Sequence, residues 1–414
     1  MIDEIEKEVL ERIKPSKDDF EKINNTVEEV LEALKGFEAE VHGSFRKGTW
    51  LKGDTDVDIF VFFPKELGKE YMPNALKLIE DRLRKFNYQI NYAEHPYIII
   101  KNNGMEIDVV PALRVDSGEN AVTAVDRTPF HTALINSSLT DEQKDQVRLL
   151  KRFMKGIGTY GAEIKVKGFS GYVCELLILN YGSFREVLKA SSDWRPPVKI
   201  LIRQPTVVFD SPLIIVDPVD PRRNAASAVS LKKLGEFSIA SKFYLEKPSI
   251  DFFFPPEVNE VDIKGEVLVS EILLQENVSQ DVLWGQINSS VTRIRNQLKS
   301  KGFEVIDVQA YGNDRKIIIA TQISSRFPPQ YYLNLGPPFY VNAKGFFKKN
   351  ENVWVGDDGN LYSIKKREIT PAEDVVKLSI QVKHKYSLRE YWLSERPKDP
   401  CLKQFLRKTP AWLK

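Results

Sequence analysis

Three carboxylates on two short apolar segments are the residues of this chain whose types and spacing suggest chemistry. Asp56 and Asp58 are two positions apart in TDVDIFVFF, so their side chains point to the same face of a strand. Asp108 is a third acid, within MEIDVVP. Burying unpaired charge is unfavourable, and a divalent cation would offset that cost. Three carboxylates on adjacent strands are the geometry that holds two Mg²⁺ ions for phosphoryl or nucleotidyl transfer.

The segment before the acid pair strengthens this interpretation. Alone, the pair has a plainer explanation, an exposed face of an edge strand, because short motifs often occur by chance. Gly43 and Ser44 precede it, followed by basic residues, in GSFRKGTWLKGDTDVDIFVFFP. A Gly-Ser turn that opens a short helix offers backbone N–H groups and a hydroxyl to phosphate oxygens. The combination predicts a site for metal ions and a phosphorylated substrate.

Length and composition indicate the number of domains and the class of protein. At about 150 residues per domain, 414 residues predict two or three domains. The chain is 42% hydrophobic and 29% charged, which is typical of a globular protein. Its net charge is only +2, so any binding of nucleic acid must come from local patches.

Cysteine usage and hydropathy exclude other classes. With only two cysteines, Cys174 and Cys401, the chain has no disulfide framework and no Cys-based zinc site. The charged N-terminal residues do not form a signal peptide, and no stretch approaches 18 apolar residues. We therefore expect a soluble cytoplasmic protein without membrane contact.

The elements that must position the acids are those of a small mixed α/β domain. Ser16 and Asp19 form a capping box for a helix over 16–35. Asn102, Asn103 and Gly104 indicate a hairpin between two strands. The expected elements after the first helix are strands over 38–41 and 55–63, a helix over 74–86, and strands over 97–101 and 105–110.

The middle of the chain is mostly helical. Thr140 and Gln143 form a second capping box, for a helix that runs to about Lys155. Further helices are expected over 173–181 and 225–245. The helical character ends at about residue 247.

The remainder begins at a boundary around Pro255-Pro256 and is α+β. A βαββ unit is expected, with a strand over 265–273, a helix over 279–300, and strands over 303–310 and 315–322. The fold class is thus α+β and multidomain. We expect a catalytic domain over 1–138, a mostly helical nucleotide- and substrate-binding domain over 139–250, and a C-terminal body and tail over 251–414.

Five separated segments in the same order carry a resemblance to a known family. Besides GTWLKGDTDVDIFVFFP, they are RTPFHTALI (127–135), LLKRFMKGIGTYGAE (149–163), KGFSGYVCELLILNYGSF (167–184) and DPVDPRRN (217–224). Together they resemble the archaeal class I CCA-adding enzymes, within the superfamily of DNA polymerase β and poly(A) polymerases. The resemblance implies a polymerase β-like head and template-independent addition and repair of the 3′-terminal CCA of tRNA, with CTP and ATP as substrates and two Mg²⁺ ions.

The same resemblance assigns roles to individual residues. It implies that Asp56, Asp58 and Asp108 are catalytic and hold the metal ions. The nucleotide contacts that it implies are Ser44, Lys47, His131, Lys151, Tyr160 and Arg223.

Several of these residues have alternatives that the sequence leaves open. The family has an arginine where this chain has Lys47, so Arg46 could take the triphosphate contact instead. Arg222 is as available as Arg223 for reading the base, and both could be surface charges. A lone histidine such as His131 is often a hydrogen-bonded core residue, and Lys151 could belong to a solvated helix face.

The C-terminal segment is locally basic. Residues 383–414 contain nine Lys and Arg against three Asp and Glu, with the aromatic residues Tyr386, Tyr391, Trp392, Phe405 and Trp412 between them. Such a segment suits phosphate contact and base stacking, or else an amphipathic helix with its aromatic side chains in the core. The resemblance implies that this region binds the acceptor arm of tRNA.

Two other functions compete with this one. The first is a poly(A) polymerase-like or other RNA nucleotidyltransferase, and the second is a non-catalytic RNA-binding relative. The second would be expected to have lost one of the three carboxylates, which are all present. A homodimer also stays open.

Overall fold

The computed structural model describes residues 2–54, 56–92, 96–102, 104–258 and 261–413. The chain divides into two compact units. The first extends to Glu257 and also includes the C-terminal segment from Pro410, and the second is Val258–Thr409. In the part of the chain that is described, no helix is long and apolar enough to cross a membrane.

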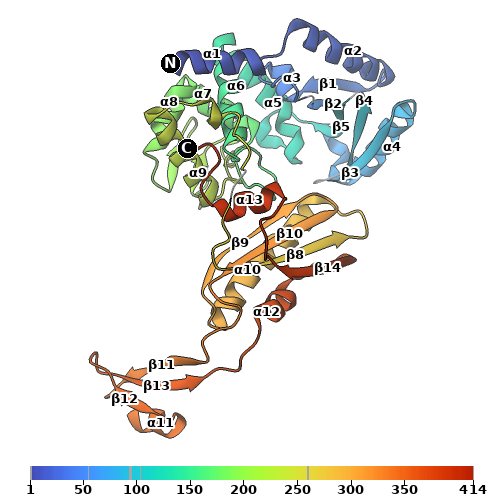
Figure 1. Ribbon diagram of the computed structural model, residues 1–414. Helices are drawn as coiled ribbons and strands as arrows, with labels where there is room; N and C mark the ends of the chain where they lie inside the picture. The colour runs from blue at the N-terminus through green and yellow to red at the C-terminus, as the bar shows by residue number, and fades with distance from the viewer. Residues whose placement is uncertain (1, 55, 93–95, 103, 259–260, 414) are drawn as a thin grey trace. The chain divides into compact units, whose positions relative to one another are not determined.

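A five-stranded sheet with the order β1-β2-β5-β4-β3 begins the first unit (Figure 1). β2 and β5 are parallel, and the other neighbours are antiparallel. Because β2 has a partner on both sides, the edge-strand explanation of the acid pair is wrong. The predicted residues Thr55 and Asn103 lie outside the described residues. The strands are β1 (Glu38–His42), β2 (Asp56–Pro64), β3 (Tyr88–Tyr92), β4 (Pro96–Asn102) and β5 (Met105–Arg114).

One face of this sheet is covered by helices. Val57, Ile59 and Val61 alternate along β2 and pack with apolar residues of α2 and α4 in one core. The predicted capping box of Ser16 and Asp19 is confirmed at the start of α2. The helices of this part are α1 (Ile2–Ile13), α2 (Lys17–Ala33), α3 (Gly43–Lys47), α4 (Met72–Leu83) and α5 (Thr128–Ser138).

The rest of the first unit is mostly helical, as predicted, and the capping box of Thr140 and Gln143 is confirmed. The prediction of a helix from residue 225 was wrong by six residues. Asn224 accepts hydrogen bonds from the N–H groups of Ile215 and Ala226 and holds a turn there, so the helix starts only after Ser230, its N-cap. The elements are α6 (Asp141–Gly156), α7 (Gly171–Tyr181), α8 (Phe184–Ser192), β6 (Val198–Ile200), β7 (Leu213–Ile215) and α9 (Leu231–Glu246).

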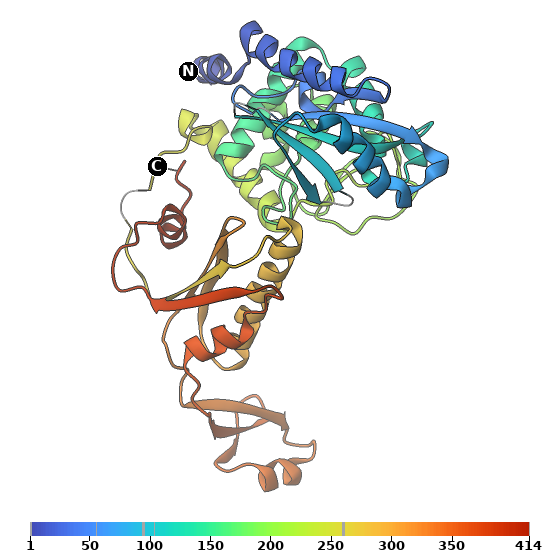
Figure 2. The ribbon, with the colours of Figure 1, turned by 90° about the vertical axis from the view of Figure 1, so that its right-hand side faces the viewer.

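The second unit contains the predicted βαββ segment within a four-stranded sheet of order β14-β8-β10-β9. α10 and α12 pack on one face of this sheet and α13 on the other, as Figure 2 shows for α10 and α13. A three-stranded sheet of order β11-β13-β12 follows β10 in sequence. The elements are β8 (Glu266–Leu274), α10 (Gln280–Ser300), β9 (Val305–Gly312), β10 (Lys316–Ile323), β11 (Tyr331–Pro338), α11 (Ala343–Lys349), β12 (Val353–Val355), β13 (Asn360–Lys366), α12 (Ala372–Ser379), β14 (Tyr386–Trp392) and α13 (Pro400–Arg407).

Two aromatic residues of the basic segment are core residues. Phe405 of α13 is buried against β8 and β10. Trp412 is buried in the core of the first unit and stacks on Phe252 with ring centroids 4.8 Å apart. For Phe405 the amphipathic-helix alternative holds, whereas Trp412 lies beyond the helix. Base stacking is excluded for both, because their apolar faces are already covered.

Candidate active site

The three acids of the first unit lie on the two central strands of its sheet. Asp58 on β2 is directly opposite Asp108 on β5 in the parallel register, and Asp56 is opposite Glu106. A Cβ atom on Gly43, whose φ is +67°, would stand 1.8 Å from Asp58 Oδ2. The Asp58 carboxylate therefore lies directly against the backbone at the start of α3, an approach that only glycine allows.

Negative charge is disfavoured at this face of the sheet. Burial and the charges of Asp58 and Asp56 raise the pKa of Asp108 to about 7. Burial also raises the pKa of Asp58, although the charge of Lys47 opposes the shift. Burial and the charge of Asp54 raise the pKa of Asp56. Asp58 and Asp108 are thus half-buried and Asp56 is exposed, with too little positive charge around them to offset the repulsion.

In type and charge, this donor set fits a divalent cation. Carboxylate oxygens are the ligands that Mg²⁺ prefers, and a cation would relieve the repulsion that raises these pKa values. Over the described ranges, no three His, Cys, Asp or Glu side chains already form a metal cage. The three carboxylates would therefore have to turn toward a common point to hold an ion.

Two lysines form a buried ion cluster with Glu175 of α7. Glu175 accepts hydrogen bonds from Lys47 Nζ at 2.5 Å and from Thr49 Oγ1 at 2.6 Å. Lys151 of α6 donates from Nζ to the carbonyl and hydroxyl oxygens of Thr49 at 3.1 and 3.2 Å. Lys151 is only 3% exposed, so the explanation as a solvated helix face is wrong. Arg46, the alternative to Lys47, is exposed.

Tyr160 meets Lys151 at the first residue of α7. A Cβ atom on Gly171 would stand 3.0 Å from Tyr160 Oη and 3.4 Å from Lys151 Nζ. Both groups therefore lie at the N-terminus of an eleven-residue helix capped by Ser170, where the helix dipole favours an anion. Ser44 lies in α3, directly after Gly43, and its carbonyl accepts a hydrogen bond from the N–H of Thr49 at 3.0 Å.

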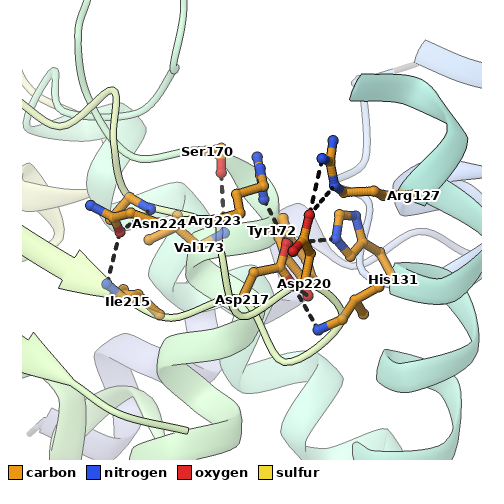
Figure 3. A network of polar contacts seen from close by, with 12 residues as sticks. Arg127, His131, Ser170, Tyr172, Val173, Ile215, Asp217, Asp220, Arg223 and Asn224 are labelled. Carbon is orange, nitrogen blue, oxygen red and sulfur yellow. Dashed lines mark hydrogen bonds and ion pairs between the residues drawn. The ribbon is translucent and has the colours of Figure 1, made fainter. Parts of the chain in front are cut away.

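A second buried carboxylate, Asp217, gathers the residues expected to contact the nucleoside (Figure 3). Its Oδ2 lies 2.9 Å from His131 Nε2 and accepts a hydrogen bond from Arg223 Nη1 at 2.8 Å. Its Oδ1 accepts from Tyr172 Oη at 3.0 Å, and the Tyr172 and His131 rings stack with centroids 4.0 Å apart. Burial alone would raise the pKa of Asp217, but the hydrogen bond and charge of His131 lower it.

Arg222 has different partners from Arg223. Its guanidinium donates to Asp220 Oδ1 at 3.0 Å, and Arg127 donates to the other oxygen of the same carboxylate at 3.0 Å. These groups and Arg223 line a cavity of about 540 Å³. Arg223 thus shares a carboxylate with His131, and Arg222 does not.

The sequence reasoning missed the two carboxylates that organise these clusters. Glu175 had a signal, because it is a lone acid within the apolar helix segment YVCELLIL. Asp217 lies in DPVDPRRN beside the arginines, where acid and base alternate without indicating which side chains pair. Tyr172 and Thr49 had no distinguishing signal.

Family models match three successive parts of the chain. Three family models match: "Nucleotidyltransferase domain" over residues 23–131, "tRNA nucleotidyltransferase, second domain" over 145–254, and "CCA-adding enzyme, C-terminal domain" over 264–388. Among solved structures, the Cid1 poly (U) polymerase with MgGTP bound matches with a TM-score of 0.48 at 17% identity, over 61% of this chain and 97% of its own.

Similar full-length relatives carry one name. The CCA-adding enzyme of Sulfurisphaera tokodaii is 55% identical over 99% of this chain and 100% of its own length. That of Saccharolobus shibatae is 54% identical over the same shares of both chains. Identity at this level over the whole length, together with the paired acids on β2 and β5, places this chain in the family of the CCA-adding enzymes, which are nucleotidyltransferases.

Proposed function

We propose that this chain adds and repairs the 3′-terminal CCA of tRNA with CTP and ATP, without a template. The ribose hydroxyl at the RNA end attacks the α-phosphate in line, and pyrophosphate leaves. The full-length match to CCA-adding enzymes carries this proposal. The acid face of β2 and β5 supports it, because nucleotidyl transfer needs a place for cations beside the reacting phosphate.

Asp56, Asp58 and Asp108 would hold the divalent cations, two Mg²⁺ ions in this proposal. When bound, such ions lower the pKa of an attacking hydroxyl and stabilise the charge on the reacting and leaving phosphates. Asp108 is the acid that we place nearest the primer hydroxyl, as acceptor of its proton.

Ser44, Lys47, Lys151 and Tyr160 are the proposed contacts of the triphosphate. The ammonium groups of Lys47 and Lys151 lie around one carboxylate, and Tyr160 Oη and Lys151 Nζ lie together at Gly171. We assign the contact at 46–47 to Lys47, because Lys47 belongs to this cluster while Arg46 is exposed.

His131 and Arg223 are the proposed contacts of the nucleoside. A guanidinium presents its donors as a rigid fork, which can meet the acceptors of cytosine and adenine. Asp217 accepts from one nitrogen of Arg223 and leaves the others for a base. We prefer Arg223 to Arg222, because Arg223 is joined to His131 through Asp217.

The second unit is the proposed site for the tRNA acceptor arm. Its family model is that of the C-terminal domain of CCA-adding enzymes, and its last part carries residues 383–409 of the basic segment over 383–414. A-form RNA is recognised mostly through its backbone and shape. We place the protein with its substrate in the cytoplasm and leave a homodimer open.

Sizing the products from a tRNA that lacks CCA tests the function, with each nucleotide supplied alone and CTP and ATP together. We expect two residues from CTP alone, three from the mixture, and little from UTP or GTP. Asp58→Asn should lower addition at least about 100-fold with tRNA affinity retained. The exposed acid Asp116 supplies the matched control, Asp116→Asn, with normal addition. Long homopolymers or efficient use of UTP would contradict the proposal.

A further inference from the structure

Glu175 is a buried charged group to which the proposed reaction gives no role. It has no exposed surface and lies in α7 among the buried residues Cys174, Leu176 and Leu177. An ionised carboxylate in such surroundings is retained only where it is paired and hydrogen-bonded. Both of its oxygens are engaged, Oε2 by Lys47 and Oε1 by Thr49.

The partners of Glu175 come from two segments that both supply proposed contacts of the triphosphate. Lys47 ends α3, directly before the turn that leads to the acid strand β2, and Lys151 belongs to α6 of the helical part. Thr49 joins them, because its hydroxyl donates to Glu175 Oε1 and accepts from Lys151 Nζ. One carboxylate thus fixes two ammonium groups from distant parts of the sequence.

The cluster keeps an excess of positive charge. Two ammonium groups face one carboxylate, with Lys47 Nζ at 2.5 Å and Lys151 Nζ at 3.8 Å from its oxygens. Counted as ionised, the three groups sum to +1, from two positive charges and one negative, although burial lowers the pKa of Lys151. The carboxylate therefore orders both lysines without neutralising them, and an anionic ligand still gains by binding there.

We propose that Glu175 is a positioning residue for nucleotidyl transfer, which holds Lys47 and Lys151 where the triphosphate of the incoming nucleotide binds. This inference rests on the proposed function, specifically on the triphosphate contacts. Glu175 itself touches no phosphate, since two anions would repel each other. It acts through the two lysines, so its loss leaves their charges in place and removes their fixed positions.

The position of the reacting phosphate matters more for the rate than for binding. A displacement of about 1 Å can cost about 100-fold in rate. Glu175→Gln should therefore lower kcat about 10- to 100-fold. CTP binding, measured by equilibrium dialysis without tRNA, should change less than about threefold, because both ammonium groups remain. Glu175→Asp keeps the charge on a shorter side chain, and its kcat should fall between those of Glu175→Gln and the wild type.

A merely structural role would affect unfolding and leave kcat alone. Glu6→Gln is the matched control, because Glu6 is a buried acid that accepts from Arg185 Nε at 2.8 Å and takes no part in the site. All variants are assayed well below their unfolding temperatures. A kcat for Glu175→Gln within twofold of that of Glu6→Gln would overturn the inference. If Glu175→Gln does not fold, Glu175→Asp decides in the same way, with a kcat at least about fivefold below the control expected.

Lys47→Met and Lys151→Met separate this inference from the function on which it rests. Both should weaken binding of CTP and of tripolyphosphate, the probe for the phosphate contacts alone. If neither weakens them, the proposed triphosphate contacts fail, and the inference fails with them. If both weaken binding while Glu175→Gln keeps the control's kcat, only the inference fails.

Discussion

The acids on the sheet, Asp58 and Asp108, are half-buried, those among the helices, Glu175 and Asp217, are fully buried, and the charges of the two sets are compensated differently. Glu175 and Asp217 each accept hydrogen bonds from cationic side chains, and these partners lower the pKa of both carboxyls against the effect of burial. Asp108 and Asp58 lie opposite each other on β5 and β2, and the pKa of each is raised. The ionised form of a carboxyl group is thus stabilised in one region and destabilised in the other.

This difference in charge compensation separates acids that stabilise the fold from acids that are suited to bind a cation from solution. A buried carboxylate with its cation built into the chain stabilises the fold, and its removal leaves the cation unpaired. A buried carboxylate without one costs stability until an ion arrives from solution. The two classes therefore predict opposite signs for the same kind of substitution.

The largest effect is expected at Asp217. Asp217→Asn should lower the free energy of unfolding by about 3–5 kcal/mol at pH 7, because Arg223 loses its charge partner and His131 loses a charged hydrogen-bond partner. The folded-state pKa is lowered, so this stability is fully present above the unfolded pKa of about 4 and is lost progressively as the pH falls from there through the folded-state pKa. Urea unfolding at pH 7 and pH 3 measures the difference, and equal deficits at both would contradict the pairing.

Gly43 tests how the acid face is built. In Gly43→Ala the new Cβ atom would meet the Asp58 carboxylate, and the φ of +67° would strain the backbone. We expect addition to fall about 100-fold as Asp58 is displaced. Gly53→Ala is the matched control, with a φ of +87° and nothing within 4 Å of the new atom. If both variants lost equal activity, backbone strain would be the cause and the contact with Asp58 would not matter.

Asp108 should show the opposite sign from Asp217. The folded-state pKa of Asp108 is raised to about 7. Its ionisation therefore does not lower the free energy of unfolding below about pH 4 and lowers it by the full amount above about pH 7. Asp108→Asn should therefore stabilise the protein by roughly 1–3 kcal/mol at pH 8 without divalent ions, while abolishing addition. Thermal unfolding at pH 8 and pH 4 checks this. The gain should shrink when Mg²⁺ is added, and a gain at pH 4 as large as at pH 8 would contradict it.

The smallest change in the free energy of unfolding is expected for a surface ion pair, which serves as a reference for the buried acids. Lys408 and Asp307 form a pair at 2.9 Å in the second unit, with side chains 38% and 20% exposed. Lys408→Met should change the free energy of unfolding by only about 0–1 kcal/mol, because water screens such a pair. The same urea experiment measures it. A loss comparable to that of Asp217→Asn would mean that burial does not decide how much an ion pair contributes to stability.

Local patterns in the sequence determined much of the fold. The capping boxes at Ser16 and Thr140, the hairpin between β4 and β5, and the βαββ order of the second unit follow from turn chemistry and periodicity, which act over a few residues. The acids of β2 and β5 and the family were also visible, because motifs are read along the chain. The helix expected from residue 225 was misplaced, since the Asn224 side chain accepts a hydrogen bond from the N–H of Ile215 in β7 and holds the turn.

The pairing of charges was decided by the tertiary structure alone. Lys47 and Glu175 are 128 positions apart, and His131 and Asp217 are 86 apart. No local pattern links residues at such distances, and a carboxylate in sequence does not show whether a cation will be packed against it. Packing brings α3, α6 and α7 together around one carboxylate and so makes Glu175 a stable anion. The pairing of β2 with β5 brings Asp58 and Asp108 together without such a cation cluster.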